Sequence, residues 1–312
     1  MKQLSLIVVI VGWLGLAALP ARAQEPEIDL TPPELGSFDP ASVEGVVVED
    51  YPLLPAMTEH ARAIYARGQA AARNPRAFSK IGDCMTASEE FMTPFGTGDF
   101  DLGEFAELAA IIAYFAEEPV REIDAATVSA FDNPGLATAS GFNTASLQEA
   151  IWANPNFCEA GESPLSCEYR VSNPAWAIIM LGTNDILFID PPTFDYYLRS
   201  IVLETINSDV VPILNTFPTR LETPERTRLY NQIIIQIALD YDLPLINLWL
   251  GLQSLPFEGV DQAEPIHLSS DPEASTGLLT PEGLEWGYNF RNLVTLQALD
   301  TLVTALDTPQ QP

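Results

Sequence analysis

Four short apolar segments alternate with longer helical patterns, and this alternation constrains the fold of the chain most. Residues 175–181 (AWAIIML) form an apolar run that is too short for a helix and suits a strand buried on both faces. Strands are also expected over 77–81, 210–217 and 244–250. Helical patterns span 59–73, 101–118, 193–207, 224–242 and 281–306, with a further helix expected to begin at 146. Strands that alternate with helices predict a parallel sheet covered by helices on both faces, a three-layer α/β/α sandwich.

The first 23 residues have the pattern of a signal peptide. Lys2 precedes an apolar run over 4–19, and residues 21–23 have the small-x-small pattern of a cleavage site before Gln24. An uncleaved anchor helix is the alternative, but the run is shorter than the roughly 20 apolar residues that a span needs, and two glycines interrupt it. We therefore expect an exported protein, secreted or periplasmic, with no membrane contact after cleavage.

The mature chain divides into an arm and one large domain. Residues 24–58 combine many prolines with many acids, so we expect an extended arm that lies on the domain or serves as a linker, outside the core. The orderly pattern of strands and helices follows, and we assign residues 59–312 to a single domain. The chain is 47% hydrophobic, which provides enough apolar material for a core.

The mature chain is strongly acidic. Residues 1–23 contain two basic residues and no acid, so the mature chain has 12 basic and 43 acidic residues and a formal net charge of 12 − 43 = −31. Its only lysine is Lys80. Such a surface repels nucleic acids and anionic membranes, which we exclude as partners. The composition suits salty or acidic surroundings as well as an ordinary soluble surface, and both interpretations stay open.

The mature chain has three cysteines, and export permits disulfides. Cys158 and Cys167 bracket a short polar segment that contains Gly and Pro, so that a bond between them closes an easy loop. We predict that these two residues form a disulfide. Cys84 is then a free thiol, which calls for an explanation.

Three polar motifs are expected at the edge of the sheet where parallel α/β folds bind their ligands. GDC ends at Cys84, GTND spans 182–185 and EPIHL spans 264–268. The chain has two histidines: His267 in the last motif, and His60 among polar residues of the first predicted helix. With so few histidines and no cluster of ligands at metal-binding spacing, we expect no metal and no other cofactor.

In this order, the motifs resemble the sequence blocks of the SGNH (GDSL-type) hydrolases. SKIGDCMTAS resembles the first block, in which Gly-Asp-Ser carries the nucleophile, so Cys84 takes that position. ASGFNTASL resembles the second block, whose glycine, here Gly141, gives an amide to the oxyanion hole, and MLGTNDI matches the third, with Asn184 as a side-chain donor. The Cys84 amide would be the third donor.

EPIHLSS is similar to the fifth block, in which an acid precedes the catalytic histidine by three residues. This similarity implies His267 as the general base and Glu264 as the acid that orients it. The resemblance covers about three quarters of the chain, from Phe78 to the last helix, and implies a flavodoxin-like version of the predicted sandwich.

The chain departs from the family's pattern at two positions. Cys84 replaces the nucleophilic serine, and Glu264 replaces an aspartate, which lengthens that side chain by one methylene. Asp261 lies nearby in the sequence and is an alternative partner for His267. If Cys84 is a working nucleophile, we expect its thiol to be exposed and partly ionised near neutral pH, because His267 and the start of a helix both favour the thiolate.

The resemblance implies hydrolysis of a carboxylic ester, either of a small molecule or of acyl groups on a glycan, without a cofactor. An extracellular binding module that kept the cleft and lost turnover is the alternative, because a buried cysteine can replace serine as a small apolar residue. A structural cell-surface protein that makes contacts through its acidic arm is a third reading. The sequence does not specify the substrate, the acyl length or the oligomeric state.

Overall fold

The centre of the structure is a parallel β-sheet. The computed structural model describes residues 28–123 and 125–307, so the predicted signal peptide over 1–23 lies outside the described residues. The strand order is β1-β5-β6-β7 and every pairing in this sheet is parallel. The strands are β1 (Asn74–Gly82), β5 (Pro174–Met180), β6 (Val211–Asn215) and β7 (Leu245–Ile246).

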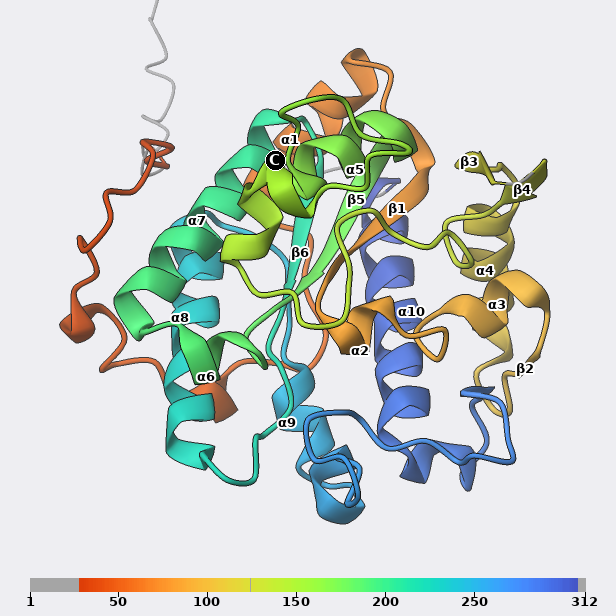
Figure 1. Ribbon diagram of the computed structural model, residues 1–312. Helices are drawn as coiled ribbons and strands as arrows, with labels where there is room; N and C mark the ends of the chain where they lie inside the picture. Colours follow the sequence, from red (N-terminus) through yellow and green to blue (C-terminus); the bar gives the residue numbers. More distant parts are fainter. Residues whose placement is uncertain (1–27, 124, 308–312) are drawn as a thin grey trace, which may run out of the picture.

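Helices cover both faces of this sheet. The longer ones are α1 (Glu59–Ala70), α4 (Ala109–Ala116), α5 (Pro164–Ser172), α7 (Pro191–Asn207), α8 (Pro224–Asp240) and α10 (Gly287–Leu306). The short ones are α2 (Cys84–Ala87), α3 (Thr93–Thr97), α6 (Asp185–Phe188) and α9 (Leu248–Leu252). Figure 1 shows α7 and α8 on one side of the sheet and α4 and α10 on the other. The predicted α/β fold, with a parallel sheet between helical layers, is confirmed.

Two small sheets and two isolated bridges, one of them between Val260 and Leu268, complete the strand pairing of the described residues. Parallel β2 (Phe100–Asp101) and β8 (Gly277–Leu278) pair in one small sheet, and antiparallel β3 (Arg121–Ile123) and β4 (Ala126–Val128) in the other. Beyond β1, Thr138 forms an isolated parallel bridge with Gly82. A flavodoxin-like sheet has a full strand at this position, so here that strand is reduced to one bridge.

Several elements differ from the sequence-based expectation. The apolar run over 244–250 contains only two strand residues and turns helical at Leu248, because the Asn247 side chain accepts a hydrogen bond from the Leu250 amide and starts α9. The helix expected from 146 consists of two 3-10 turns, Ala145–Gln148 and Ala150–Trp152. Helix α5 was not predicted, although Ser163 caps it and a proline occupies its first turn.

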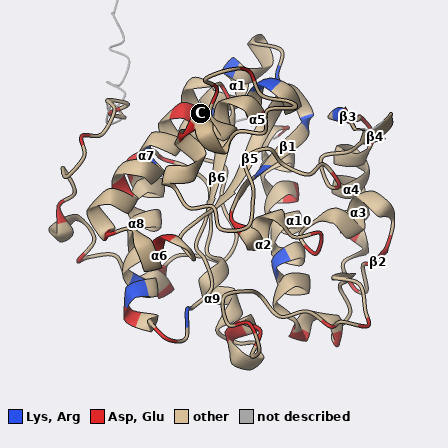
Figure 2. Cartoon of the chain, in the orientation of Figure 1, with Lys and Arg blue, Asp and Glu red and all other residues tan. Residues whose placement is uncertain are grey.

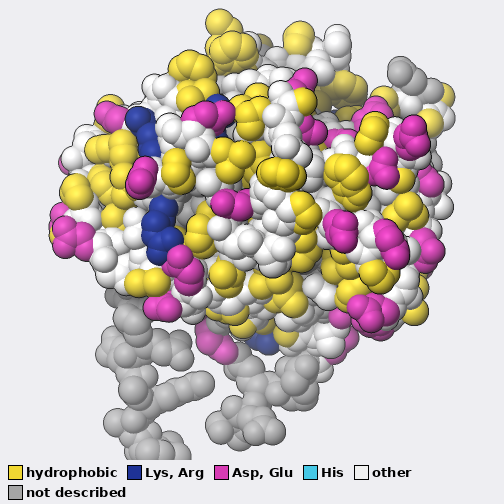
Figure 3. All heavy atoms as spheres, turned by 90° about the horizontal axis from the view of Figure 1, so that it is seen from below, with side chains coloured by type: hydrophobic (Ala, Val, Ile, Leu, Met, Phe, Trp, Pro, Cys, Tyr) yellow, Lys and Arg dark blue, Asp and Glu magenta, His cyan; other side chains and the backbone are white. Residues whose placement is uncertain are grey.

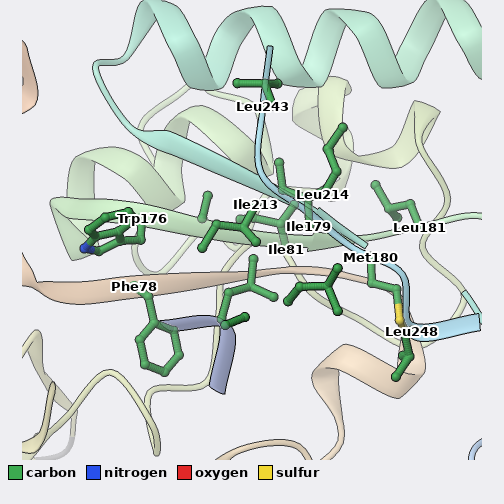
Figure 4. Packing of buried hydrophobic residues seen from close by; sticks show 14 of the residues in the cluster. Phe78, Ile81, Trp176, Ile179, Met180, Leu181, Ile213, Leu214, Leu243 and Leu248 are labelled. Carbon is green, nitrogen blue, oxygen red and sulfur yellow. The ribbon is translucent and has the colours of Figure 1, made fainter. Parts of the chain in front are cut away.

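The central strands form an apolar core. Every residue of β5 is buried, which explains why residues 174–180 lack the alternation of a half-exposed strand. Ile81, Ile179 and Leu214 are register neighbours across β1, β5 and β6, and they meet in the core in Figure 4. Each such side chain contributes about 1.5–3 kcal/mol when it is fully buried.

The proline-rich arm is partly integrated into the domain. Val43, Val46 and Val48 are buried, and the Asn247 side chain donates a 2.7 Å hydrogen bond to the Val48 carbonyl oxygen. The expectation that the arm lies outside the core is therefore wrong for these valines, which bury apolar surface in and between two short 3-10 turns, Pro40–Ser42 and Val48–Asp50. Residues 28–42 run along the outside of the domain in Figure 1.

The described residues also carry the predicted disulfide. Cys158 and Cys167 are bonded, with their Cα atoms 5.3 Å apart, and Cys84 is free. Figure 2 shows Asp and Glu spread over many helices and loops, with Lys and Arg in few places. Within residues 28–123 and 125–307, none of the helices combines the length and the apolar character needed to cross a membrane.

Candidate active site

Cys84 lies where β1 meets α2, in a turn that buried residues hold in place. The Asp83 side chain caps α2 by accepting a 3.0 Å hydrogen bond from the Met85 amide. From α10, the guanidinium of Arg291 donates to the Met85 carbonyl oxygen at 2.8 Å and to the Thr86 hydroxyl at 2.9 Å. Arg291 is 1% exposed, so a buried cation on α10 holds this turn in place.

His267 lies in the loop after α9, and Glu264 in the same loop contacts its ring. Nδ1 of His267 is 2.9 Å from Oε2 of Glu264. Asp261 has a different role, because its Oδ1 accepts from the backbone amides of Ala263 at 2.7 Å and Glu264 at 2.9 Å. With Nδ1 donating to the carboxylate, Nε2 is left as the acceptor that a general base needs.

One cavity of about 620 Å³ brings Cys84, Glu264 and His267 together. These three residues come from two segments that lie about 180 residues apart in the sequence. The fold brings the two segments together. The remaining lining residues are Ala87, Ser88, Glu90, Ser140, Asp261, Ala263, Leu268, Ser270 and Tyr288. Cys84 and His267 are half-buried, whereas Glu264 is 70% exposed.

The two other residues proposed for the oxyanion hole lie on neighbouring loops but do not line this cavity. Gly141 is in a turn closed by a hydrogen bond from the Phe142 amide to the Ala139 carbonyl oxygen, and its φ of +83° favours glycine. Nδ2 of Asn184 donates to the Phe142 carbonyl oxygen at 2.8 Å. The structure therefore joins the Gly141 and Asn184 loops to each other, and of these loops only Ser140 reaches the cavity wall.

The acidity of Cys84 differs from the expectation. Burial, and secondly the charge of Asp83, raise the pKa of the Cys84 thiol to about 11. The expected thiolate near neutral pH is wrong for this structure, because α2 is a single turn and the favourable contributions of backbone amides and Arg220 are smaller than the cost of burial. The thiol is therefore protonated at neutral pH and needs a base to become a nucleophile.

Two buried carboxylates lie beside the candidate site. Burial raises the pKa of Asp83 to about 7 and that of Asp185 to about 6, and one oxygen of each has no hydrogen-bond partner. Oδ1 of Asp185 accepts from the Thr144 amide at 2.9 Å and from its hydroxyl at 2.6 Å. Asp185 thus fastens the second motif to the third, as expected for a residue with a structural role.

The sequence did not single out Arg291 or Glu90, although both lie at the site. As the one basic residue of the helical pattern over 281–306, Arg291 offered a usable signal, since a buried cation needs specific partners. Glu90 gave no signal, because acids are common on this chain. His60 is far from Cys84: its Nδ1 is 2.6 Å from the Tyr241 carbonyl oxygen, and it lines a different cavity between α1 and the arm.

The described residues offer no metal-ligand set at the cavity. Their one cluster of three candidate ligands is Cys158, Glu162 and Cys167, and the two thiols of this cluster are consumed by the disulfide.

Comparisons with known proteins identify similar folds at low identity. No family model and no curated protein matches the chain. A lipase/acylhydrolase from Enterococcus faecalis is 19% identical, with a TM-score of 0.39 over 56% of this chain and 77% of that one. An acetyl xylan esterase from Geobacillus stearothermophilus is 17% identical, with a TM-score of 0.43 over 75% and 97%. The esterase EstA from Pseudoalteromonas is 14% identical, with a TM-score of 0.44 over 75% and 100%.

Proposed function

We propose that this chain is an exported hydrolase of carboxylic esters that uses Cys84 as its nucleophile, as its resemblance to the SGNH (GDSL-type) hydrolases implies. A single observation carries the proposal. The cavity is lined at once by a free thiol, by the imidazole of His267 and by Glu264, whose carboxylate is 2.9 Å from the ring. A nucleophile, a base and a group that orients the base are the parts that acyl transfer needs.

The first half of the reaction forms a thioester. Nε2 of His267 accepts the thiol proton while Sγ of Cys84 attacks the ester carbonyl carbon, and Glu264 stabilises the imidazolium that results. The pKa of Cys84, raised to about 11, makes this proton transfer part of the attack. The tetrahedral oxyanion then collapses, and the imidazolium gives its proton to the departing alkoxide.

The second half returns the enzyme to its starting state. Water gives a proton to His267 and attacks the thioester carbonyl carbon, the carbon–sulfur bond breaks, and the thiolate recovers the proton from the imidazolium. The Cys84 amide, the Gly141 amide and the Asn184 side chain are proposed to hold the oxyanion. Since Asn184 donates one of its two amide hydrogens to Phe142, the other is available for this role.

A binding module without turnover is the second candidate. The high pKa of Cys84 favours it, as does the position of Gly141 and Asn184 outside the cavity lining. Such a protein would keep the cavity and bind an ester or a glycan without cleaving it. The predicted arm over 24–58 and domain over 59–312 belong to both candidates, as does export from the cell.

Turnover of p-nitrophenyl acetate by the mature protein separates the two candidates. We expect hydrolysis by the wild type, and its loss by at least roughly 100-fold in Cys84→Ala, which removes the nucleophile and keeps the cavity. Alkylation of Cys84 with iodoacetamide should abolish turnover in the wild type. Full activity of Cys84→Ala, or a folded wild type that hydrolyses no ester, would reject the hydrolase and leave the binding module.

A further inference from the structure

One part of the cavity wall is built around a fixed carboxylate, that of Glu90. Oε2 of Glu90 accepts a 3.2 Å hydrogen bond from the Ser88 hydroxyl, and Oε1 accepts one from the Ser270 hydroxyl. The Glu90 carbonyl oxygen is also held, by the Thr276 hydroxyl at 2.7 Å and by the Asn292 side chain at 2.8 Å. This carboxylate is therefore positioned by partners from two segments before a substrate arrives.

Glu90 is the carboxylate of the cavity lining that neither contacts His267 nor closes the His267 loop. Asp261 uses Oδ1 to hold its own loop, and Glu264 contacts His267. A carboxylate accepts about four hydrogen bonds, and each Glu90 oxygen has one donor from a serine. The side chain therefore keeps acceptor capacity for hydroxyl groups.

The charges of the cavity restrict which molecules enter it. Its lining includes the carboxylates of Glu90, Asp261 and Glu264, and neither Lys nor Arg occurs among the described residues that line it. The lower face in Figure 1, to which the loop after α9 contributes, carries many acidic and few basic side chains when seen from below in Figure 3. An anionic substrate meets like charge both at the surface and inside the cavity.

We propose that Glu90 selects an uncharged, hydroxyl-rich alcohol portion of the substrate, such as a neutral sugar ring, and excludes anionic ones. Ser88 and Ser270 donate their hydroxyl hydrogens to the carboxylate and keep lone pairs that can accept, and the hydroxyl of Ser140, which also lines the cavity, can donate. Each hydroxyl group of a sugar ring can both donate and accept a hydrogen bond, which matches this wall of donors and acceptors. The inference rests on the proposed hydrolase function and specifies its substrate class.

The test compares three acetylated methyl glycosides: a neutral xyloside, an anionic glucuronide and a cationic glucosaminide. For the wild type, kcat/KM is expected to favour the neutral ester over the anionic one by roughly tenfold or more. Glu90→Gln should reduce this ratio by at least roughly threefold. Glu89→Gln is the matched control, because it removes the same charge from the exposed neighbouring residue, outside the cavity lining, and should leave the ratio unchanged.

The outcomes separate this inference from the proposed function. Equal kcat/KM for the neutral and anionic esters, or an equal effect of the two Gln variants, would overturn the role of Glu90 while the hydrolase stands. A preference for the cationic ester of more than roughly tenfold over the neutral one would overturn it too, since charge alone would then decide. If Glu90→Gln does not fold, the wild-type ratio should still fall when salt is raised from about 50 mM to about 500 mM, and a constant ratio would oppose the inference.

A binding measurement covers the case in which p-nitrophenyl acetate is not hydrolysed and the hydrolase proposal fails. The unacetylated methyl xyloside should then slow alkylation of Cys84 by iodoacetamide, whereas the glucuronide at equal concentration should not. Equal protection by both glycosides, or protection by neither, would overturn the selection by Glu90.

Discussion

Nδ1 of His267 lies 2.9 Å from Oε2 of Glu264, three residues earlier in the same loop. The backbone supports this pair, because the His267 amide donates to the Glu264 carbonyl oxygen at 2.9 Å and the Asp261 amide donates to the His267 carbonyl oxygen at 3.0 Å. Glu264 and Asp261 therefore divide two tasks, contact with the ring and closure of the loop.

The division of tasks predicts different effects of two conservative substitutions. Glu264→Gln should lower kcat of ester hydrolysis by roughly 10- to 100-fold, since the neutral amide no longer stabilises the imidazolium. The loss should be smaller than for a buried acid, because Glu264 is 70% exposed and water screens its charge. Asp261→Asn retains an oxygen at the Oδ1 position and should change kcat less. Steady-state kinetics of both folded variants checks this, and a greater loss in Asp261→Asn would reverse the assignment.

The two histidines of the chain provide a second contrast. His267→Ala should reduce ester hydrolysis by at least roughly 100-fold, because the protonated thiol then lacks its base. His60→Ala should leave the rate near that of the wild type, since His60 contacts Tyr241 in another part of the fold. Rates are compared after thermal unfolding shows that both variants fold. Similar losses in the two variants would contradict the role given to His267.

The buried carboxyl of Asp83 should make stability depend on pH. Burial raises its pKa from 3.8 to about 7, so the native state favours the protonated form. That contribution to stability is complete below about pH 4 and is lost as the pH rises through about 7. Asp83→Asn stays neutral, so its Tm relative to the wild type should increase between about pH 4 and about pH 8 by about 3 °C or more. A constant difference in Tm would show that Asp83 does not titrate in this range.

The same substitution should make the Cys84 thiol more acidic. The charge of Asp83 is the second contribution, after burial, to the raised pKa of Cys84. At about pH 8 Asp83 is ionised, and its replacement by Asn should speed alkylation of Cys84 by iodoacetamide roughly three- to tenfold. In the wild type, the rate should keep rising beyond about pH 9, as a pKa of about 11 requires. A plateau near neutral pH would instead indicate a thiolate stabilised by His267.

The disulfide should contribute to stability without affecting the cavity. Replacing Cys158 and Cys167 together by Ala should lower the free energy of unfolding by about 2–3 kcal/mol. This is the conformational entropy that closing so short a loop removes from the unfolded chain. Ester hydrolysis should be retained, because neither residue lines the cavity. Denaturant unfolding measures the first effect, and a peptide map under non-reducing conditions should show this pair linked and Cys84 unlinked. A link from Cys84 to either residue would also remove the proposed nucleophile.

The sequence by itself determined the layers of this protein and the motifs at one edge of its sheet. The apolar run of β5 has no polar face, so it has to be covered on both sides, and the intervening helical patterns supply that cover. The disulfide was predictable because it is local, between residues nine positions apart. Local rules also explain the error at 244–250, where a side-chain cap from Asn247 competed with the apolar pattern and started α9.

Only the tertiary structure decided the acidity and the surroundings of Cys84. The pKa of a thiol depends on how deeply it is buried and on charges that the fold brings near, such as Asp83, and a sequence pattern reports neither. The same holds for Arg291 and Glu90, which reach the site from α10 and from the segment after α2 through contacts over about 200 and about 180 residues. Such contacts form only when distant segments pack together, so the motifs located the candidate site while the packing set its charge.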